Sequence, residues 1–179
     1  SELELEHSLS GDGKPGEVEL EQAFVEFDLN DDLTSSVGLQ LIPVGILNET
    51  HEPPTFYGVE RNEVEKNIIP STWWEAGVKL SGKIGETIQY DAMVHSGLET
   101  PIAGGNAFLI RKGRQKVANA TWKNAAFTGR LTWMPIAGVS FGARVQSQDD
   151  LTQTAAPPSA TFFAAPADIR RQISTSSEF

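Results

Sequence analysis

Hydrophobic and polar residues alternate with a period of two along most of this chain. Between residues 33 and 41, for example, the odd positions are mainly Leu and Val, and the even positions are Thr, Ser, Gly and Gln. Because successive side chains of a strand point to opposite faces, this pattern predicts strands with one apolar and one polar face. The segments that show it clearly are 23–29, 33–41, 78–84, 88–95, 125–133 and 139–146.

Two further segments fit the pattern less well. The phase reverses at Val18 and Leu20, which predicts a bulge or a strand end in the first half of segment 17–29. Segment 161–170 contains Pro166, which disfavours a central strand there. With a weak strand around Leu3, the sequence predicts seven strands and an eighth candidate.

The connections between these segments alternate strictly between short and long. Short turns are predicted at 30–32, 85–86 and 135–137, and long loops at 8–16, 43–75, 96–124 and 147–159. In an up-and-down sheet, all the short turns then lie at one end and all the long loops at the other. Bacterial outer-membrane barrels have this asymmetry, and their tilted strands need only about 9–11 residues to cross the bilayer.

The same alternation also fits a soluble antiparallel sandwich, in which the apolar face packs on a core. Small residues among the aromatics on the apolar face favour lipid contact, because a packed core must fill its volume. These are Gly82, Ala92, Gly129 and Ala143, while Trp133, Phe127 and Tyr90 lie near strand ends as an interfacial girdle requires. The expected fold is therefore all-β, an antiparallel up-and-down transmembrane β-barrel, present as a partial barrel of seven or eight strands.

Composition excludes several other classes. The 179 residues include 14 Lys and Arg against 24 Asp and Glu, giving a net charge of -10, and no cysteine. The charge argues against nucleic acid as a partner, and the absence of cysteine removes disulfides, zinc–thiolate sites and thiol nucleophiles. No nucleophile–base arrangement or phosphate loop stands out, so we predict no enzyme, no cofactor and no metal. A possible group of Glu49, His51 and Glu52 has too few histidines for a metal site.

The stretch from Glu17 to Leu98 resembles the phosphate-selective porin O/P family of Gram-negative outer membranes. The resemblance is carried by EVELEQAFVEF (17–27), GLQLIPVG (38–45), NETHEPPTFYGVER (48–61) and IPSTWWE (69–75), and continues more loosely to Asp150. It implies a homotrimeric porin of the bacterial outer membrane, in contact with lipid, whose first long loops fold into the lumen. It also implies that residues 1–179 are one partial porin domain, an internal fragment of a longer chain.

Family members owe their anion preference to basic pore residues, whereas this chain is acidic overall. On the predicted lumen face, four basic residues stand against three acidic ones, so this wall is mildly basic. The predicted pore-lining residues are Lys79, Lys83, Asp91, Arg130, Arg144, Glu26 and Asp28. The expected function is passive diffusion of small hydrophilic solutes, with some preference for anions such as phosphate, although mixed charge does not establish phosphate specificity.

Loop 43–75 is too long for a simple turn, and loops of this length are usually functional or disordered. Residues 59–66 could form a short helical turn. The functional interpretation is a loop that narrows the pore, and the alternative is a surface loop whose charges face water. The residues expected at the constriction are His51, Glu60, Arg61 and Lys66.

Two interpretations stay open at this point. The basic cluster of Arg111, Lys112, Arg114 and Lys116 could contact lipid phosphates or attract anions to the pore mouth, or it could simply be solvated. The whole chain could instead be a soluble β-sandwich that binds carbohydrate through Trp73 and Trp74.

Overall fold

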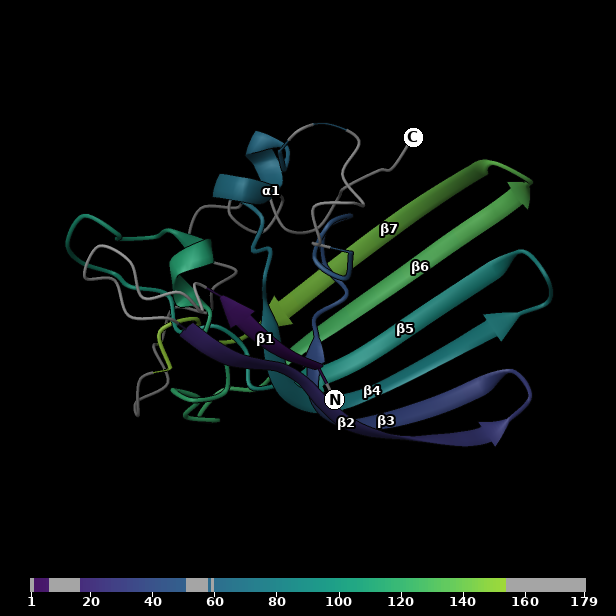
Figure 1. Cartoon of the computed structure of the whole chain (residues 1–179), viewed down its shortest axis with the longest axis horizontal. Coiled ribbons are helices and arrows are strands. Elements are labelled where there is room, and N and C mark those ends of the chain that lie inside the picture. The colour runs from purple at the N-terminus through teal and green to yellow at the C-terminus, as the bar shows by residue number, and fades with distance from the viewer. Residues whose placement is uncertain (1, 7–16, 51–57, 59, 154–179) are drawn as a thin grey trace.

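A computed structural model describes residues 2–6, 17–50, 58 and 60–153 (Figure 1). Seven antiparallel strands form one sheet in chain order. Their bounds are β1 Glu2–Glu6, β2 Glu17–Asn30, β3 Leu33–Leu41, β4 Trp74–Ile84, β5 Ile88–His95, β6 Ala126–Ile136 and β7 Val139–Gln148. The predicted all-β, up-and-down architecture is confirmed. Among the described strands β1 and β7 lie at the two edges, so the sheet is open and is not closed into a barrel.

Each strand lies where the alternation predicts it, with differences at the ends. The register between β1 and β2 shifts between Leu20 and Gln22, which places an extra residue at Glu21 and confirms the predicted bulge. β4 begins at Trp74, inside the predicted loop, because the β3–β4 ladder continues to the pair Leu41–Trp74. The candidate strand at 161–170 lies outside the described residues.

The last hairpin also differs from the prediction. β6 extends to Ile136, so Pro135 belongs to the strand and not to the turn. The β6–β7 register shifts between Trp133 and Ile136, and this irregularity accommodates a residue that has no backbone N–H to donate. The turn itself is formed by Ala137 and Gly138, with Gly138 at a φ of 82°.

The three short hairpin turns lie together at one end of the sheet, and the long connections gather at the other (Figure 1). A short helix, α1 (Glu63–Asn67), begins at Asn62, whose side chain accepts a hydrogen bond from the Glu65 amide at 2.9 Å. It covers the second half of the helical turn predicted at 59–66 and ends one residue later, at Asn67. A 3-10 turn, η2 (Ile110–Gly113), lies in the loop after β5. Within the described ranges, no helix is long and apolar enough to cross a membrane.

The main hydrophobic cluster of the described residues lies against the polar face of the sheet, at the loop end. It consists of Ile42, Val44, Ile69, Trp73, Met93, Leu98, Ile110 and Leu151. Of these, only Met93 belongs to a strand, and it shares a face with its neighbours Lys79 and Thr128. The long loops therefore bring their own apolar residues onto the polar side of the strands.

Within the part of the chain that the structure describes, no such cluster covers the apolar face of the strands. One cross-strand row runs through Val25, Val37, Val78, Val94 and Phe127, each directly opposite the next. These five side chains are between 45% and 60% exposed. Further rows add exposed Leu80, Leu131, Val145, Trp133 and Phe141. The sheet thus presents a continuous apolar surface outward and a polar surface toward the loops.

Candidate functional site

The polar face of the sheet brings together all seven residues predicted to line a pore. One cross-strand row consists of Asp28, Thr34, Ser81, Asp91, Arg130 and Arg144, and a neighbouring row of Glu26, Ser36, Lys79, Met93, Thr128 and Gln146. Lys83 lies on the same face, opposite Gln89. Charge changes along the first row, from an acidic residue on β2 to two arginines on β6 and β7. The alternation alone was enough to place these residues on one surface.

Three charged side chains form a cluster at the middle of this face. Arg130 donates from Nε to Asp91 Oδ2 at 2.7 Å, and its Nη2 lies 2.6 Å from the same oxygen. The Nη1 of Arg130 pairs with the carboxylate of Glu49. Asp91 is fixed from the other side, since Ser81 Oγ donates to its Oδ1 at 2.6 Å. Two carboxylates therefore face one guanidinium, so Arg130 is not a free cation on this wall.

Glu49 reaches this cluster from the loop between β3 and β4, and Arg130 is 81 residues away in the sequence. The base of the loop is closed by Asn48. Its Nδ2 donates to the carbonyls of Ile42 and Trp73, both at 2.8 Å, and its Oδ1 accepts from the Trp73 amide at 2.8 Å. The loop thus leaves β3 and β4 at a fixed neck, and Glu49 turns over the polar face to meet the guanidinium that Arg130 extends from β6 toward Asp91 of β5.

Glu65 of α1 shapes the first turn of this loop. Its carboxylate accepts hydrogen bonds from the backbone amides of Ile46 and of Leu47, the latter at 2.9 Å. Gly45 lies beside it with a φ of 73°. A Cβ at position 45 would lie 2.7 Å from Glu65 Oε1, so only glycine fits both the backbone conformation and the space.

The loop after β5 is fastened by Glu75, at the start of β4. This buried carboxylate accepts from Ser96 Oγ at 2.6 Å, Trp73 Nε1 at 3.0 Å and the Gln115 amide at 2.9 Å. The amides of Lys116 and Val117 also point to it, at 3.2 and 3.4 Å. Both residues have positive φ, which turns successive N–H groups toward one acceptor.

The basic cluster after β5 connects the two long loops. Arg111 Nη1 donates to Ser71 Oγ at 2.9 Å, and Arg114 Nη1 donates to Thr72 Oγ1 at 2.7 Å. Arg61 Nη1 also reaches Ser71 Oγ, at 3.5 Å. Burial, together with the nearby charge of Arg61, lowers the pKa of Arg111. The simple expectation of a fully solvated cluster is therefore wrong for Arg111 and Arg114, whereas Lys112 is exposed.

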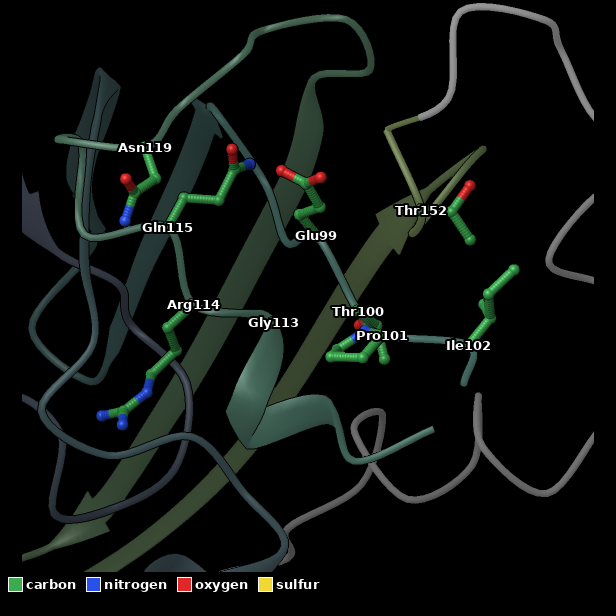
Figure 2. A pocket seen from close by; sticks show the side chains of 9 residues that line it. All are labelled: Glu99, Thr100, Pro101, Ile102, Gly113, Arg114, Gln115, Asn119 and Thr152. Atoms are coloured by element: carbon green, nitrogen blue, oxygen red, sulfur yellow. The ribbon is translucent and has the colours of Figure 1, made fainter. Parts of the chain in front are cut away.

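A cavity of about 450 Å³ opens at the loop end of the molecule (Figure 2). It is bordered by Glu99, Thr100, Gly113, Gln115 and Thr152 among others, all from the loops beyond the strands. Arg114 points away from the Glu99 and Gln115 side chains in this view (Figure 2). The cavity is separate from the charged cluster on the polar face of the strands.

The four predicted constriction residues have different outcomes. His51 lies outside the described residues, and of Lys66 only the backbone, in α1, is described. Glu60 is exposed, and Arg61 Nη1 lies 3.5 Å from Ser71 Oγ of the same loop. A charged residue of this loop that pairs with a strand residue is Glu49, which the sequence suggested only as a weak metal ligand. Among the described residues, no group of three or more acidic or histidine side chains could hold a metal ion.

The two tryptophans considered as a carbohydrate platform are both buried. Trp73 contacts His95 edge to face, with ring centroids 5.5 Å apart, and Lys116 Nζ lies 4.3 Å from the centre of the Trp74 ring. Neither ring presents an open face on which a sugar could stack. Trp73 is the last residue of the loop and Trp74 is the first residue of β4, so the alternation of the strand does not yet apply to this pair.

Comparison with known proteins gives a distant relative without a described activity. The chain is 35% identical over 156 residues to an uncharacterized protein of Aquifex aeolicus (strain VF5). The match covers 83% of this chain and 36% of the relative, so the chain spans about a third of that protein's length. No family model and no solved structure matches the chain. The function of this chain therefore has to be inferred from the geometry of the sheet and its loops.

Proposed function

We propose that this chain is part of a transmembrane β-barrel porin of the phosphate-selective O/P type, located in a bacterial outer membrane. In this proposal the apolar face of β2–β7 contacts lipid, and the polar face lines a water-filled passage for small hydrophilic solutes. The complete protein assembles as a homotrimer, as the resemblance to that family implies. The observation that carries the proposal is the inside-out distribution of the strand residues, with the apolar face exposed and the polar face covered by loops.

The exposed face is too continuous for an ordinary water-soluble surface. The row from Val25 to Phe127 crosses five strands without a polar interruption, and none of its side chains is buried. Single exposed apolar residues are common on soluble proteins, but large contiguous patches mark interaction or membrane surfaces. A soluble sandwich would cover this same face with a second layer.

Strand length supports a membrane location. β4 and β6 each contain 11 residues. At about 3.3 Å per residue and a tilt of roughly 45°, such a strand rises about 26 Å along the membrane normal. This value is close to the apolar band of about 25 Å in outer-membrane barrels.

Aromatic residues lie where a lipid–water boundary would be. Trp133 and Phe141 face each other across β6 and β7 near the short hairpin turn, and their rings stack with centroids 5.6 Å apart. Tyr90 covers Gly82 on the neighbouring strand, where a Cβ would collide with its ring at 2.4 Å. Aromatic side chains at this level are typical of the girdle that anchors barrels at the interface.

The open edges of the sheet fit a barrel that needs further strands. The relative from Aquifex aeolicus is nearly three times as long as the matched region, which leaves room for more β-hairpins. Closure would remove the unpaired edges of β1 and β7, which are otherwise prone to aggregation.

The proposal is tested by reconstituting the complete natural polypeptide in planar lipid bilayers. We expect discrete, voltage-independent conductance steps, together with recovery of the protein from membranes only with detergent. A protein that stays in aqueous buffer without detergent and gives no conductance would exclude a porin and favour a soluble β-sheet protein.

A further inference from the structure

We propose that Glu49 is a positioning residue, whose ion pair with Arg130 holds segment 42–50 across the polar face of the sheet and so narrows the passage. This inference rests on the proposed porin function, because only a porin has a passage to be narrowed. The ion pair itself, and its role in holding the segment on the sheet, depend on the geometry alone. No pattern in the sequence connects the two residues, which belong to a loop and to a strand and lie 81 positions apart.

The segment leaves the ends of β3 and β4 in a fixed direction. Asn48 ties together Ile42 and Trp73, the residues that immediately extend β3 and β4. Its carboxamide is fully buried and uses both its donor and its acceptor groups in this neck. Glu49 is the next residue in the chain, so the hydrogen bonds of Asn48 also restrict where the Glu49 backbone lies relative to the sheet.

The Glu49 side chain reaches the polar face of the sheet. Its carboxylate pairs with Arg130 on β6, while the hairpin from which it departs is β3–β4. β5 lies between these elements, and its Asp91 binds the same guanidinium. Because Arg130 reaches across to Asp91 of β5, Glu49 meets the guanidinium beside that strand. The segment therefore turns over the polar face toward β5, instead of pointing away from the sheet.

The surroundings of the Glu49–Arg130 ion pair favour a strong attachment of the loop to the sheet. The arginine is held in place by Asp91, which is in turn held by Ser81, so the partner of Glu49 is preorganised. Both members of the pair keep less than a third of their side chains exposed, with values of 21% for Arg130 and 29% for Glu49. Charge-assisted hydrogen bonds in such partly dry surroundings are stronger than exposed ion pairs.

The remaining contacts of the segment do not replace this one. Glu65 and Asn48 order the backbone between residues 42 and 48 within the loop itself, and Ile42 and Val44 pack near the neck in the hydrophobic cluster that includes Met93 of β5. Within the described part of the segment, Glu49 supplies the ion pair to the strands. Removing its charge should leave the neck intact and release only the part of the loop that crosses the polar face.

The test uses Glu49→Gln in the complete natural protein, with Glu86→Gln as a matched control. Glu86 is an exposed residue in the β4–β5 turn at the opposite end of the sheet, so the control makes the same chemical change far from the loop. Glu49→Asp, which keeps the carboxylate, serves as the conservative variant. Hydrogen–deuterium exchange of residues 42–50 is measured in detergent, and conductance is measured in planar bilayers.

We expect exchange at Glu49 and Thr50 to accelerate roughly tenfold in Glu49→Gln, equivalent to about 1.4 kcal/mol, while residues 42–48, which the neck holds, exchange as in the wild type. Recovery should be partial in Glu49→Asp, and Glu86→Gln should show no change. The single-channel conductance of Glu49→Gln should rise above that of both the wild type and the control.

Unchanged exchange in Glu49→Gln would overturn the positioning role, whether or not the protein conducts. Faster exchange with unaltered conductance in an active channel would overturn the narrowing. If neither wild type nor variants conduct, the porin proposal fails, and the exchange result still decides the role of the ion pair.

Discussion

Leu80 of β4 lies directly opposite Ala92 of β5, and the leucine side chain remains 40% exposed on the face that turns away from the loops. A large apolar residue beside a small one leaves an uneven surface, which lipid chains can fill and a packed protein layer would have to match. The pair lies in the second apolar row, between the row of Val78 and the aromatic residues near the turns. It is therefore a suitable position at which to distinguish hydrocarbon from water.

Leu80→Arg should destabilise the protein in lipid vesicles by about 2–4 kcal/mol, since this is the cost of arginine on the lipid face near the bilayer midplane. Leu109→Arg is the matched control, because Leu109 is 44% exposed but lies in the loop after β5. That change should stay within about 0.5 kcal/mol, as for most surface substitutions. Urea unfolding followed by tryptophan fluorescence measures both. Equally small effects would mean that the apolar face contacts water.

Glu75→Gln should destabilise the loop after β5 by about 1.5–3 kcal/mol, the contribution of hydrogen bonds to a charged acceptor. The amides of Gln115 and Lys116 both donate to Glu75 Oε1, and the Val117 amide donates to Oε2. Whichever way the carboxamide of glutamine turns, its NH₂ group would therefore face at least one backbone N–H. Limited proteolysis around residues 113–118 and the unfolding midpoint both report the change. Glu86→Gln, in an exposed turn, should behave as wild type. Equal stability of Glu75→Gln and Glu86→Gln would refute the role of the Glu75 carboxylate in fastening the loop after β5.

Gly45→Ala should cost more than Gly104→Ala, although both glycines have positive φ, at 73° and 80°. The two changes share the backbone strain of a left-handed residue. A Cβ at position 45 additionally meets Glu65 Oε1 at 2.7 Å, whereas nothing lies within 4 Å of a Cβ at position 104. The difference in unfolding free energy should therefore be about 1–3 kcal/mol, the usual cost of overpacking. Similar values for both would show that Gly45 is required only for its φ.

Lys79→Glu combined with Lys83→Glu should shift ion selectivity toward cations, because both lysines lie on the polar face and charge on a pore wall biases permeation by sign. Arg130 is a poorer target, since Glu49 and Asp91 already neutralise it and its replacement would leave two adjacent carboxylates. Reversal potentials in a salt gradient give the measurement. Lys123→Glu, in an exposed loop, is the control, and it is compared with Lys79→Glu alone, which changes the charge by the same amount. A shift of the same size in the control would assign the effect to overall charge and not to the wall.

The sequence by itself determined the strands, their order and the two faces. Alternation is a local property with a period of two, so Val37 and Val78 could be assigned to one face, and Lys79 and Arg130 to the other, without knowledge of their partners. The order of short and long connections likewise predicted that the hairpin turns lie at one end. Where a local feature broke the period, as at Trp73–Trp74 and at Pro135, the strand ends were misplaced by a few residues.

Only the tertiary structure decided what the long loops do. Loops have no period, and the partner of a loop side chain depends on where the whole chain places two distant segments. The pairs Glu49–Arg130 and Glu75–Gln115, separated by 81 and 40 residues, could not be read from spacing or composition. For the same reason, the sequence placed Arg61 at a constriction, whereas in the folded chain Arg61 contacts Ser71 of its own loop and Glu49 reaches the sheet.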